Sequence, residues 1–274
     1  RLFYGHTRLY VIGENAARQG IAPFLDGLRR FRDTRQNVNI VIARGQARQI
    51  LEAELPPGKV SSLALSNMFE IEAGSTLVFP VDLNEFYYRL NNRAGTGQFA
   101  PVITLAADSV GKTESKGPSS SPAIKVSGLA VFDRDGKLVD FFGESETRGL
   151  MWILNKAQNQ NLTVISPDQP DQSLSLHVVE SESRIIVKTA ENELPSFEIR
   201  IKAMADMLEY FGVYAGELSP DYYNRLEEAA GTVIEQEIMT SINKAQALNV
   251  DLFEFGEEIK RQHSGEWEYQ KVPV

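Results

Sequence analysis

The stretch that decides the fold is SGLAVFDRDGKLVDFFGESETRGLMWILNK, residues 127–156. Within it, the pair Asp135-Gly136 separates two apolar runs, at residues 130–132 and 138–142. An Asp-Gly pair in this setting is the strongest short-range signal for a β-hairpin, because both central residues of the favoured two-residue turn have positive φ. The segment therefore predicts a hairpin over residues 127–142, followed by a helix over residues 145–157.

The residues before this stretch predict a parallel strand pair covered by helices. Strands are expected at residues 8–12 and 38–43, and helices at residues 21–31 and 46–54. The first helix has apolar residues at helical spacing, namely Ile21, Phe24, Leu25, Leu28 and Phe31. A β-α-β-α order implies parallel strands. Because two strands alone are marginal, further strands are expected before Arg1.

The residues after this stretch predict an antiparallel sheet and a long helix. Turn signals fill residues 166–171, and apolar and polar residues alternate near 174–178 and 197–201, with a short apolar run at 185–187 between them. The long helix has Ser219 as its N-cap and Pro220 in its first turn, and its apolar period continues to Ala245. A shorter helix is expected over residues 252–263.

These elements predict an α+β protein with three mixed α/β domains. The expected domains are residues 1–57, 58–157 and 158–274, and the last has its antiparallel sheet packed against the long helix. A chain of 274 residues is longer than one typical core requires. The first and the last domain are both expected to lack a part that lies outside this chain.

The composition is that of a soluble globular protein, with 42% hydrophobic and 24% charged residues. No apolar run approaches the roughly 18 residues that suggest a membrane span. Arg1 opens directly onto a strand-like pattern without a signal peptide, so we expect either a cytosolic protein or one whose export segment has been removed. Cysteine is absent, which excludes disulfides, thiol nucleophiles and cysteine-based zinc sites.

The charge is unevenly distributed along the chain. The first 50 residues hold nine Arg and no Lys against three acidic residues, a net charge of +6, so the remainder carries −15 of the total of −9. A basic head of this kind suits contact with anionic lipid or with an acidic partner. The simpler interpretation is that the arginines cover the solvent face of a helix. The candidate contacts with an anionic surface are Arg29, Arg30, Arg32 and Arg35.

Residues 106–113, AADSVGKT, resemble the end of a phosphate-binding P-loop. Ala106 stands in place of the first glycine, and residues 114–118 cannot begin the helix whose N-terminal amides hold the phosphate. A nucleotide-dependent enzyme that uses Gly111, Lys112 and Thr113 is therefore the weakest hypothesis.

Other site chemistry has little support in the sequence. The segment from Asp133 begins like a calcium loop, but its glycine falls at position four rather than six. The histidines have no partners at metal-ligand spacing, and Phe31 belongs to an apolar stripe rather than a base-stacking surface. We expect no catalytic residues, cofactor, metal site or nucleic-acid partner. The three histidines are His6, His177 and His263.

Three segments, in order, resemble the Ger(x)C family, the C subunits of the nutrient germinant receptors of Gram-positive endospore formers. Residues 127–152 are similar to the family's "SGLAVF…GKLVGFL…EE(S/T)RGLLW". Residues 4–14 resemble its "GH-(x)n-VIGE" strand, and residues 251–259 its "D-(I/V/P)-F-G-F-G-E-x-I" signature. Glu254 stands where the family usually has Gly.

The resemblance implies an extracytoplasmic lipoprotein on the outer face of the spore inner membrane. Such proteins assemble with two membrane-embedded subunits, take part in nutrient-triggered germination, have three α+β domains and are not known as enzymes. By this likeness, the lipidated cysteine would precede Arg1 and the final β segment would follow Val274. Without its anchor, this chain is expected to be soluble.

The first hypothesis for function is a non-catalytic receptor subunit that acts through protein–protein contacts. The alternative is an extracytoplasmic protein that binds the nutrient itself, although no ligand residues are identified. The candidate signature or interface positions are Asp251, Phe253, Phe255, Gly256 and Trp267. The competing interpretation is that these residues only pack the start of a helix.

Overall fold

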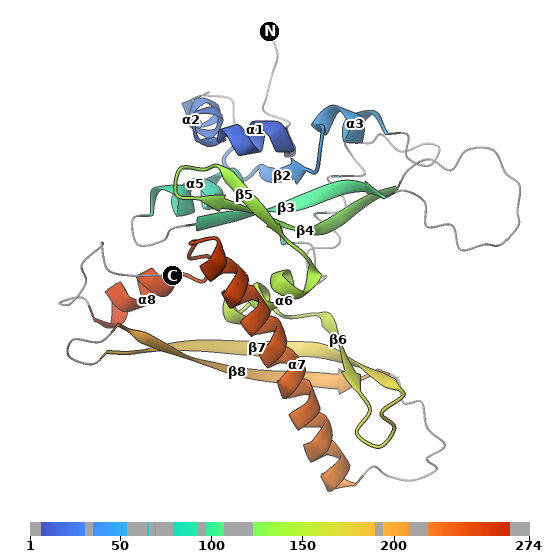
Figure 1. Cartoon of the computed structure of the whole chain (residues 1–274). Helices are drawn as coiled ribbons and strands as arrows, with labels where there is room; N and C mark the ends of the chain where they lie inside the picture. The colour runs from blue at the N-terminus through green and yellow to red at the C-terminus, as the bar shows by residue number, and fades with distance from the viewer. Residues whose placement is uncertain are drawn as a thin grey trace, which may run out of the picture. The chain divides into compact units, whose positions relative to one another are not determined.

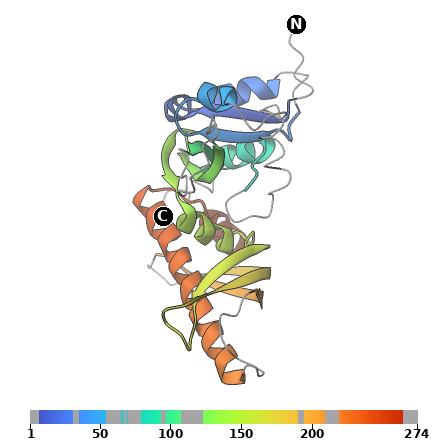
Figure 2. The same cartoon turned by 90° about the vertical axis from the view of Figure 1, so that its right-hand side faces the viewer.

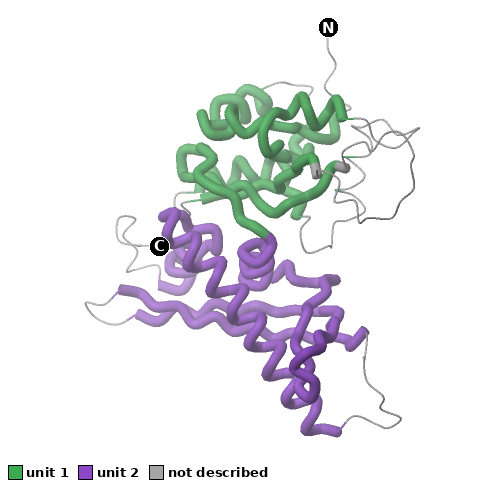
Figure 3. Tube along the Cα trace, turned by 45° about the vertical axis from the view of Figure 1, so that its right-hand side comes forward, with its two compact units in different colours: residues 1–73, 77–143 green, residues 74–76, 144–274 purple. Residues whose placement is uncertain are grey.

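The computed structural model describes residues 7–30, 35–53, 65, 69, 79–92, 97–106, 123–189, 194–208 and 219–263. The chain forms two compact units, one of residues 1–73 with 77–143 and the other of residues 74–76 with 144–274 (Figure 3). Each unit contains its own sheet. The division into three domains, with limits at residues 57 and 157, stays a prediction.

The first unit contains a mixed sheet in the order β1-β2-β3-β4-β5. β1 pairs with β2 and β2 with β3 in parallel, whereas the other neighbours are antiparallel. The predicted parallel pair is therefore present, and it continues into the strands of the predicted hairpin. The strands are β1 (Leu9–Gly13), β2 (Asn39–Ala43), β3 (Gly97–Ala106), β4 (Ala123–Asp133) and β5 (Leu138–Phe142).

The connection from β1 to β2 contains two helices rather than the single one predicted. Gly20, with a φ of 109°, separates α1 from α2. α2 turns Leu25 and Leu28 inward, where both are buried. In Figures 1 and 2, α1, α2 and α3 gather on one side of the sheet. The helices of this unit are α1 (Glu14–Gln19), α2 (Ala22–Arg30), α3 (Ala47–Glu52) and α5 (Leu83–Asn91).

The predicted hairpin is present as β4 and β5, but its turn differs from the expected type. The backbone N–H of Gly136 donates to the carbonyl of Asp133 at 3.0 Å, and the Asp133 carboxylate accepts from the N–H groups of Asp135 and Lys137, both at 2.9 Å. Gly136 has a φ of 72°, whereas Asp135 does not have a positive φ. The register also shifts between β4 and β5. The Asp133 side chain thus favours a longer loop with a bulge over the two-residue turn.

The second unit contains the antiparallel sheet β6-β7-β8, made of β6 (Gln160–Ile165), β7 (Ser173–Lys188) and β8 (Ser196–Met207). The segments predicted at 174–178 and 185–187 belong to the single strand β7. An irregularity between Val178 and Glu180 interrupts the alternation of the sequence without ending the strand. The sequence did not indicate β6, although its residues alternate strictly between buried and exposed positions.

Three helices complete the second unit, α6 (Glu144–Ile153), α7 (Pro220–Ala247) and α8 (Phe255–Gln262). The predicted cap of α7 is confirmed, because the Ser219 hydroxyl accepts from the N–H of Tyr222 at 3.2 Å. The two views of Figures 1 and 2 agree that α7 lies across one face of the sheet, as predicted. α6 ends four residues before the predicted position, and α8 begins three residues after it. Within the described ranges, no helix has both the length and the apolar character that crossing a bilayer requires.

Candidate functional site

The family-like residues of α6 form a buried polar contact with α7. The guanidinium Nε of Arg148 lies 2.8 Å from Oε1 of Glu237, and the indole N–H of Trp152 donates to Oε2 of Glu237 at 2.9 Å. Trp152 is fully buried, and Glu237 is nearly so. Burial raises the pKa of Glu237, while the bond from Trp152 and the charge of Arg148 oppose this rise. The carboxylate thereby ties two turns of α6 to α7.

Gly149 sets how closely the two helices approach. A Cβ atom at this position would lie 2.0 Å from the carbonyl oxygen of Glu237 and 2.7 Å from Cβ of Ser241. Because real Cβ atoms do not approach other heavy atoms so closely, only glycine fits this contact. The segment 147–152 is therefore explained by helix packing within the second unit.

Asp251 organises the entry to α8. Its carboxylate accepts hydrogen bonds from the backbone N–H groups of Phe253, Phe255 and Gly256, at 3.1, 3.1 and 2.9 Å. The residue is only 3% exposed, and burial raises its pKa while the three N–H groups oppose the rise. These bonds hold residues 252–254 outside the helix, which explains why α8 begins at Phe255.

The two phenylalanines of the signature pack inside the second unit. The Phe255 ring stacks on Phe197 of β8 with 4.4 Å between ring centroids, and Phe253 is 1% exposed. Gly256 is buried as well. These contacts are those expected of a packed helix start, and a role in binding a partner stays a proposal. Trp267 lies outside the described residues.

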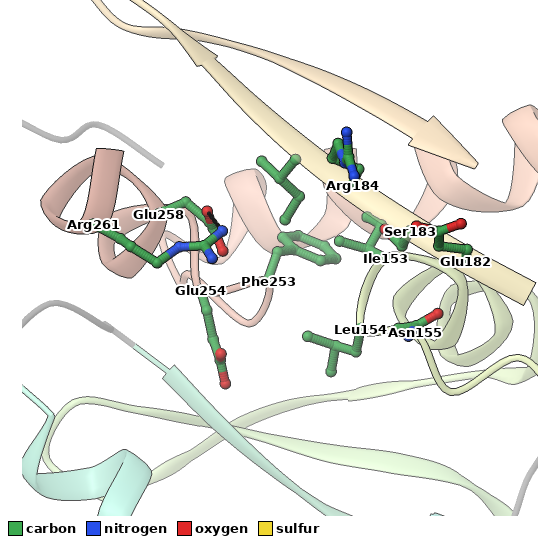
Figure 4. A pocket seen from close by; sticks show the side chains of 11 residues that line it. Ile153, Leu154, Asn155, Glu182, Ser183, Arg184, Phe253, Glu254, Glu258 and Arg261 are labelled. Atoms are coloured by element: carbon green, nitrogen blue, oxygen red, sulfur yellow. Dashed lines mark hydrogen bonds and ion pairs between the residues drawn. The ribbon is translucent and has the colours of Figure 1, made fainter. Parts of the chain in front are cut away.

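A cavity of about 400 Å³ lies beside the signature (Figure 4). Its walls come from residues 153–155 at the end of α6, from residues 182–185 of β7, and from Phe253, Glu254, Glu258 and Arg261. Figure 4 shows the Phe253 ring near Ile153, with Arg261 beside Glu258. Of these lining residues, only Phe253 is among the candidate site positions from the sequence, because the three segments lie far apart along the chain.

The cavity borders a strand edge that another strand could extend. Beyond Val178, β7 pairs with β8 alone among the strands of the described ranges. The Gln262 side chain bonds to this edge: its Nε2–H donates to the carbonyl of Ile185 and its Oε1 accepts from the N–H of Val187, both at 3.0 Å. The carboxamide thus takes the place of a peptide group from a neighbouring strand. With a period of two, the backbone of Ser183 faces the same side.

Two lining residues have left-handed backbone conformations, Asn155 with a φ of 59° and Glu254 with a φ of 63°. Asn adopts this conformation readily, whereas for Glu it costs on the order of 1 kcal/mol. The strained position is the one at which the resembling family usually has glycine. The backbone of Glu254 thus has a conformation that suits glycine.

Of the predicted anionic-surface arginines, Arg29 and Arg30 lie on α2. The Arg29 guanidinium lies over the Tyr87 ring, 3.7 Å from its centroid, and Arg30 forms an exposed ion pair with Asp26 at 2.8 Å. Arg35 is exposed. Arg32 lies outside the described residues.

The segments that resembled other sites give no further candidate. Residues 107–122, which include Gly111, Lys112 and Thr113, lie outside the described residues. Asp133 uses its carboxylate for the hairpin turn. Over the described ranges, no three His, Asp or Glu side chains gather in a way that could hold a metal ion.

Comparison with known proteins identifies two matching family models. The model described as "Spore germination B3/ GerAC like, C-terminal" matches residues 127–272, and that of the "Spore germination protein N-terminal domain" matches residues 1–105. Two relatives from Bacillus subtilis (strain 168) are the putative spore germination protein YfkR, 28% identical over 90% of this chain, and spore germination protein KC, 26% identical over 99%. The chain spans 60% and 67% of their respective lengths.

A solved structure shares the fold. The crystal structure of the GerBC protein superposes with a TM-score of 0.70, covering 95% of this chain and 70% of that one, at 19% sequence identity. The prediction of a mixed α+β protein is therefore confirmed.

Proposed function

Because the chain belongs to the spore germination B3/GerAC-like family, the Ger(x)C family that its sequence resembles, we propose that it is a non-catalytic subunit of a spore germinant receptor. It acts through protein–protein contacts with two membrane-embedded subunits during nutrient-triggered germination. The full-length protein is lipid-anchored on the outer face of the spore inner membrane. The observation that carries the proposal is the match of the N-terminal and C-terminal family models, in order, over residues 1–105 and 127–272.

The edge of β7 supports a role in protein contacts. A strand edge offers backbone donors and acceptors to an extended segment of another chain, and adjacent pockets select its side chains. Here the edge at Ser183 lies beside a cavity that contains the apolar residues Ile153 and Phe253. A partner segment could therefore gain both kinds of contact at one place.

Affinity purification of the tagged full-length protein from detergent-solubilised spore inner membrane tests this function. We expect mass spectrometry to find two polytopic membrane proteins in amounts comparable to the bait. An unrelated tagged lipoprotein of the same membrane is the control. Recovery of the bait alone would contradict the proposal.

The cavity favours a second candidate, direct binding of a small nutrient molecule. A volume of about 400 Å³ is within the range of small-molecule sites, and the lining carries both cations and carboxylates, as an amino acid would require. Calorimetry with amino acids and sugars at millimolar concentration should then give heat that Arg184→Ala abolishes. Arg200→Ala, opposite it in register but outside the cavity, should retain binding. The absence of heat and of a thermal shift would exclude this candidate.

A further inference from the structure

We propose that the outer surface of α2, together with the adjoining end of α5, docks on an anionic lipid bilayer. This α2 surface is defined by Arg29 and Arg30 of α2 with Tyr87 and Tyr88 of α5. The inference adds a lipid contact of the folded chain to the proposed membrane location and rests on that location. It can fail while the receptor-subunit proposal stands.

The helix is amphipathic in the sense that such docking requires. Leu25 and Leu28 are buried against the unit, whereas Arg29 and Arg30 are exposed. The apolar positions recur at helical spacing, so the opposite face is directed outward along the whole helix. Both arginines lie in its last turn, where cations are also favoured by the helix dipole.

Aromatic side chains accompany the cations. Tyr88 of α5 is 67% exposed. The guanidinium of Arg29 lies 3.7 Å from the centroid of the Tyr87 ring, a cation–π contact that joins α2 to α5. Exposed aromatic rings beside arginine suit the headgroup level of a bilayer, where a ring finds both apolar and polar surroundings.

The charges of the two units favour a contact through the first unit. It contains 17 Lys and Arg against 14 Asp and Glu, a net charge of +3, whereas the second contains 11 against 23, a net charge of −12. An anionic surface therefore attracts the first unit and repels the second. Asp26 offsets part of the local charge through its pair with Arg30, which is exposed and hence weak.

The exposed aromatic ring favours lipid over an acidic protein as the occupant. An acidic protein surface would use the arginines but gives no reason for the exposed Tyr88 ring. A bilayer uses both, because phosphate groups meet the cations while the ring lies at the interface. Two arginines give a weak contact alone, which becomes effective once a tether raises the local concentration.

Co-sedimentation of the 274-residue chain with vesicles tests the inference. We expect binding to vesicles of phosphatidylcholine with 30–40% phosphatidylglycerol, little binding to phosphatidylcholine alone, and loss of binding in roughly 0.5 M NaCl. The double variant R29Q/R30Q should bind about tenfold more weakly. The matched control R200Q/R225Q removes the same charge from exposed positions of the second unit and should bind like the wild type.

Several results would overturn the proposal. They are no binding to the anionic vesicles, binding unaffected by salt, or equal loss in both double variants. Binding of the chain to polyglutamate but not to vesicles would assign the surface to an acidic protein instead. Purification of the receptor subunits with the full-length R29Q/R30Q protein keeps the tests separate, since that assay reports the proposed function whether or not vesicle binding is lost.

Discussion

Glu254 has a left-handed backbone conformation, which residues with a side chain rarely adopt. Its φ of 63° lies in the left-handed region, which is open to glycine without strain. The position is fixed because Asp251 binds the N–H groups on either side of it, those of Phe253 and Phe255. The loop therefore imposes the conformation, and Glu254 adopts it with a loss of stability.

Replacing Glu254 by Gly should raise the free energy of unfolding by about 1 kcal/mol, because the strain disappears. Urea denaturation of the two proteins measures the difference. Glu257→Gly is the matched control, since Glu257 lies in the first turn of α8 and glycine there should lower stability by about 1 kcal/mol. If both variants are destabilised alike, residue 254 is not strained.

For single residues, the sequence could indicate some members of the candidate site but not the contacts that they make. Asp251 and Phe253 were named through the resemblance, and their spacing alone does not show a carboxylate bound to three backbone amides. Ser183 and Asn155 were not named, because a strand edge and a helix end carry no distinctive residue pattern. The cavity depends on contacts between residues about 30 to 100 positions apart.

The contact between α6 and α7 depends on the absence of a side chain at Gly149. Gly149→Ala should lower the free energy of unfolding by about 3 kcal/mol or more, because the added methyl group meets backbone atoms that cannot move alone. Gly231→Ala is the control on α7, where a Cβ atom would meet nothing within 4 Å, and it should raise stability by roughly 0.5–1 kcal/mol. Urea denaturation distinguishes the two. A mild effect at Gly149 would mean that the helices separate easily.

The buried Glu237 should make this contact sensitive to pH. Since burial raises its pKa, the folded state binds the proton more tightly than the unfolded state does. Its contribution to stability is therefore fully present below the ordinary glutamate pKa of about 4.3 and is lost as the pH rises through the raised value.

The variant Glu237→Gln removes this titration but keeps an acceptor for Trp152. The free energy of unfolding of the wild type, relative to that of Glu237→Gln, should decrease as the pH rises from about 4. Urea denaturation between pH 4 and 8 measures it, with Glu235→Gln, an exposed position of the same helix, as the control. A difference that stays constant with pH would contradict the raised pKa.

Most elements could be predicted from the sequence, and the errors have local causes. The hairpin and the cap of α7 were recognised because turn and capping chemistry is local. β7 was divided in two because its irregularity near Val178 changes which residues face the core. β6 was missed because turn-forming residues directly follow its short alternating run.

Apart from residues 74–76, the second unit begins at residue 144, where α6 starts. A fragment of residues 144–274 should fold alone with a single cooperative transition, because it keeps α6 against α7 and the entire β6-β7-β8 sheet. The fragment of residues 158–274 has the limit predicted from sequence and lacks Trp152, so it should not unfold cooperatively. Circular dichroism during thermal unfolding compares them. Cooperative unfolding of the shorter fragment alone would favour the three-domain division.

The Gln262 carboxamide on the edge of β7 has a consequence for observing this molecule at work. The backbone N–H of Val187 donates its hydrogen bond to the Gln262 side chain of α8 and not to a neighbouring strand. Its exchange with solvent deuterium is therefore slow only while α8 is docked. The exchange rate of the Val187 amide thus reports whether α8 is docked. A partner or ligand that displaces α8 should make this one amide exchange faster.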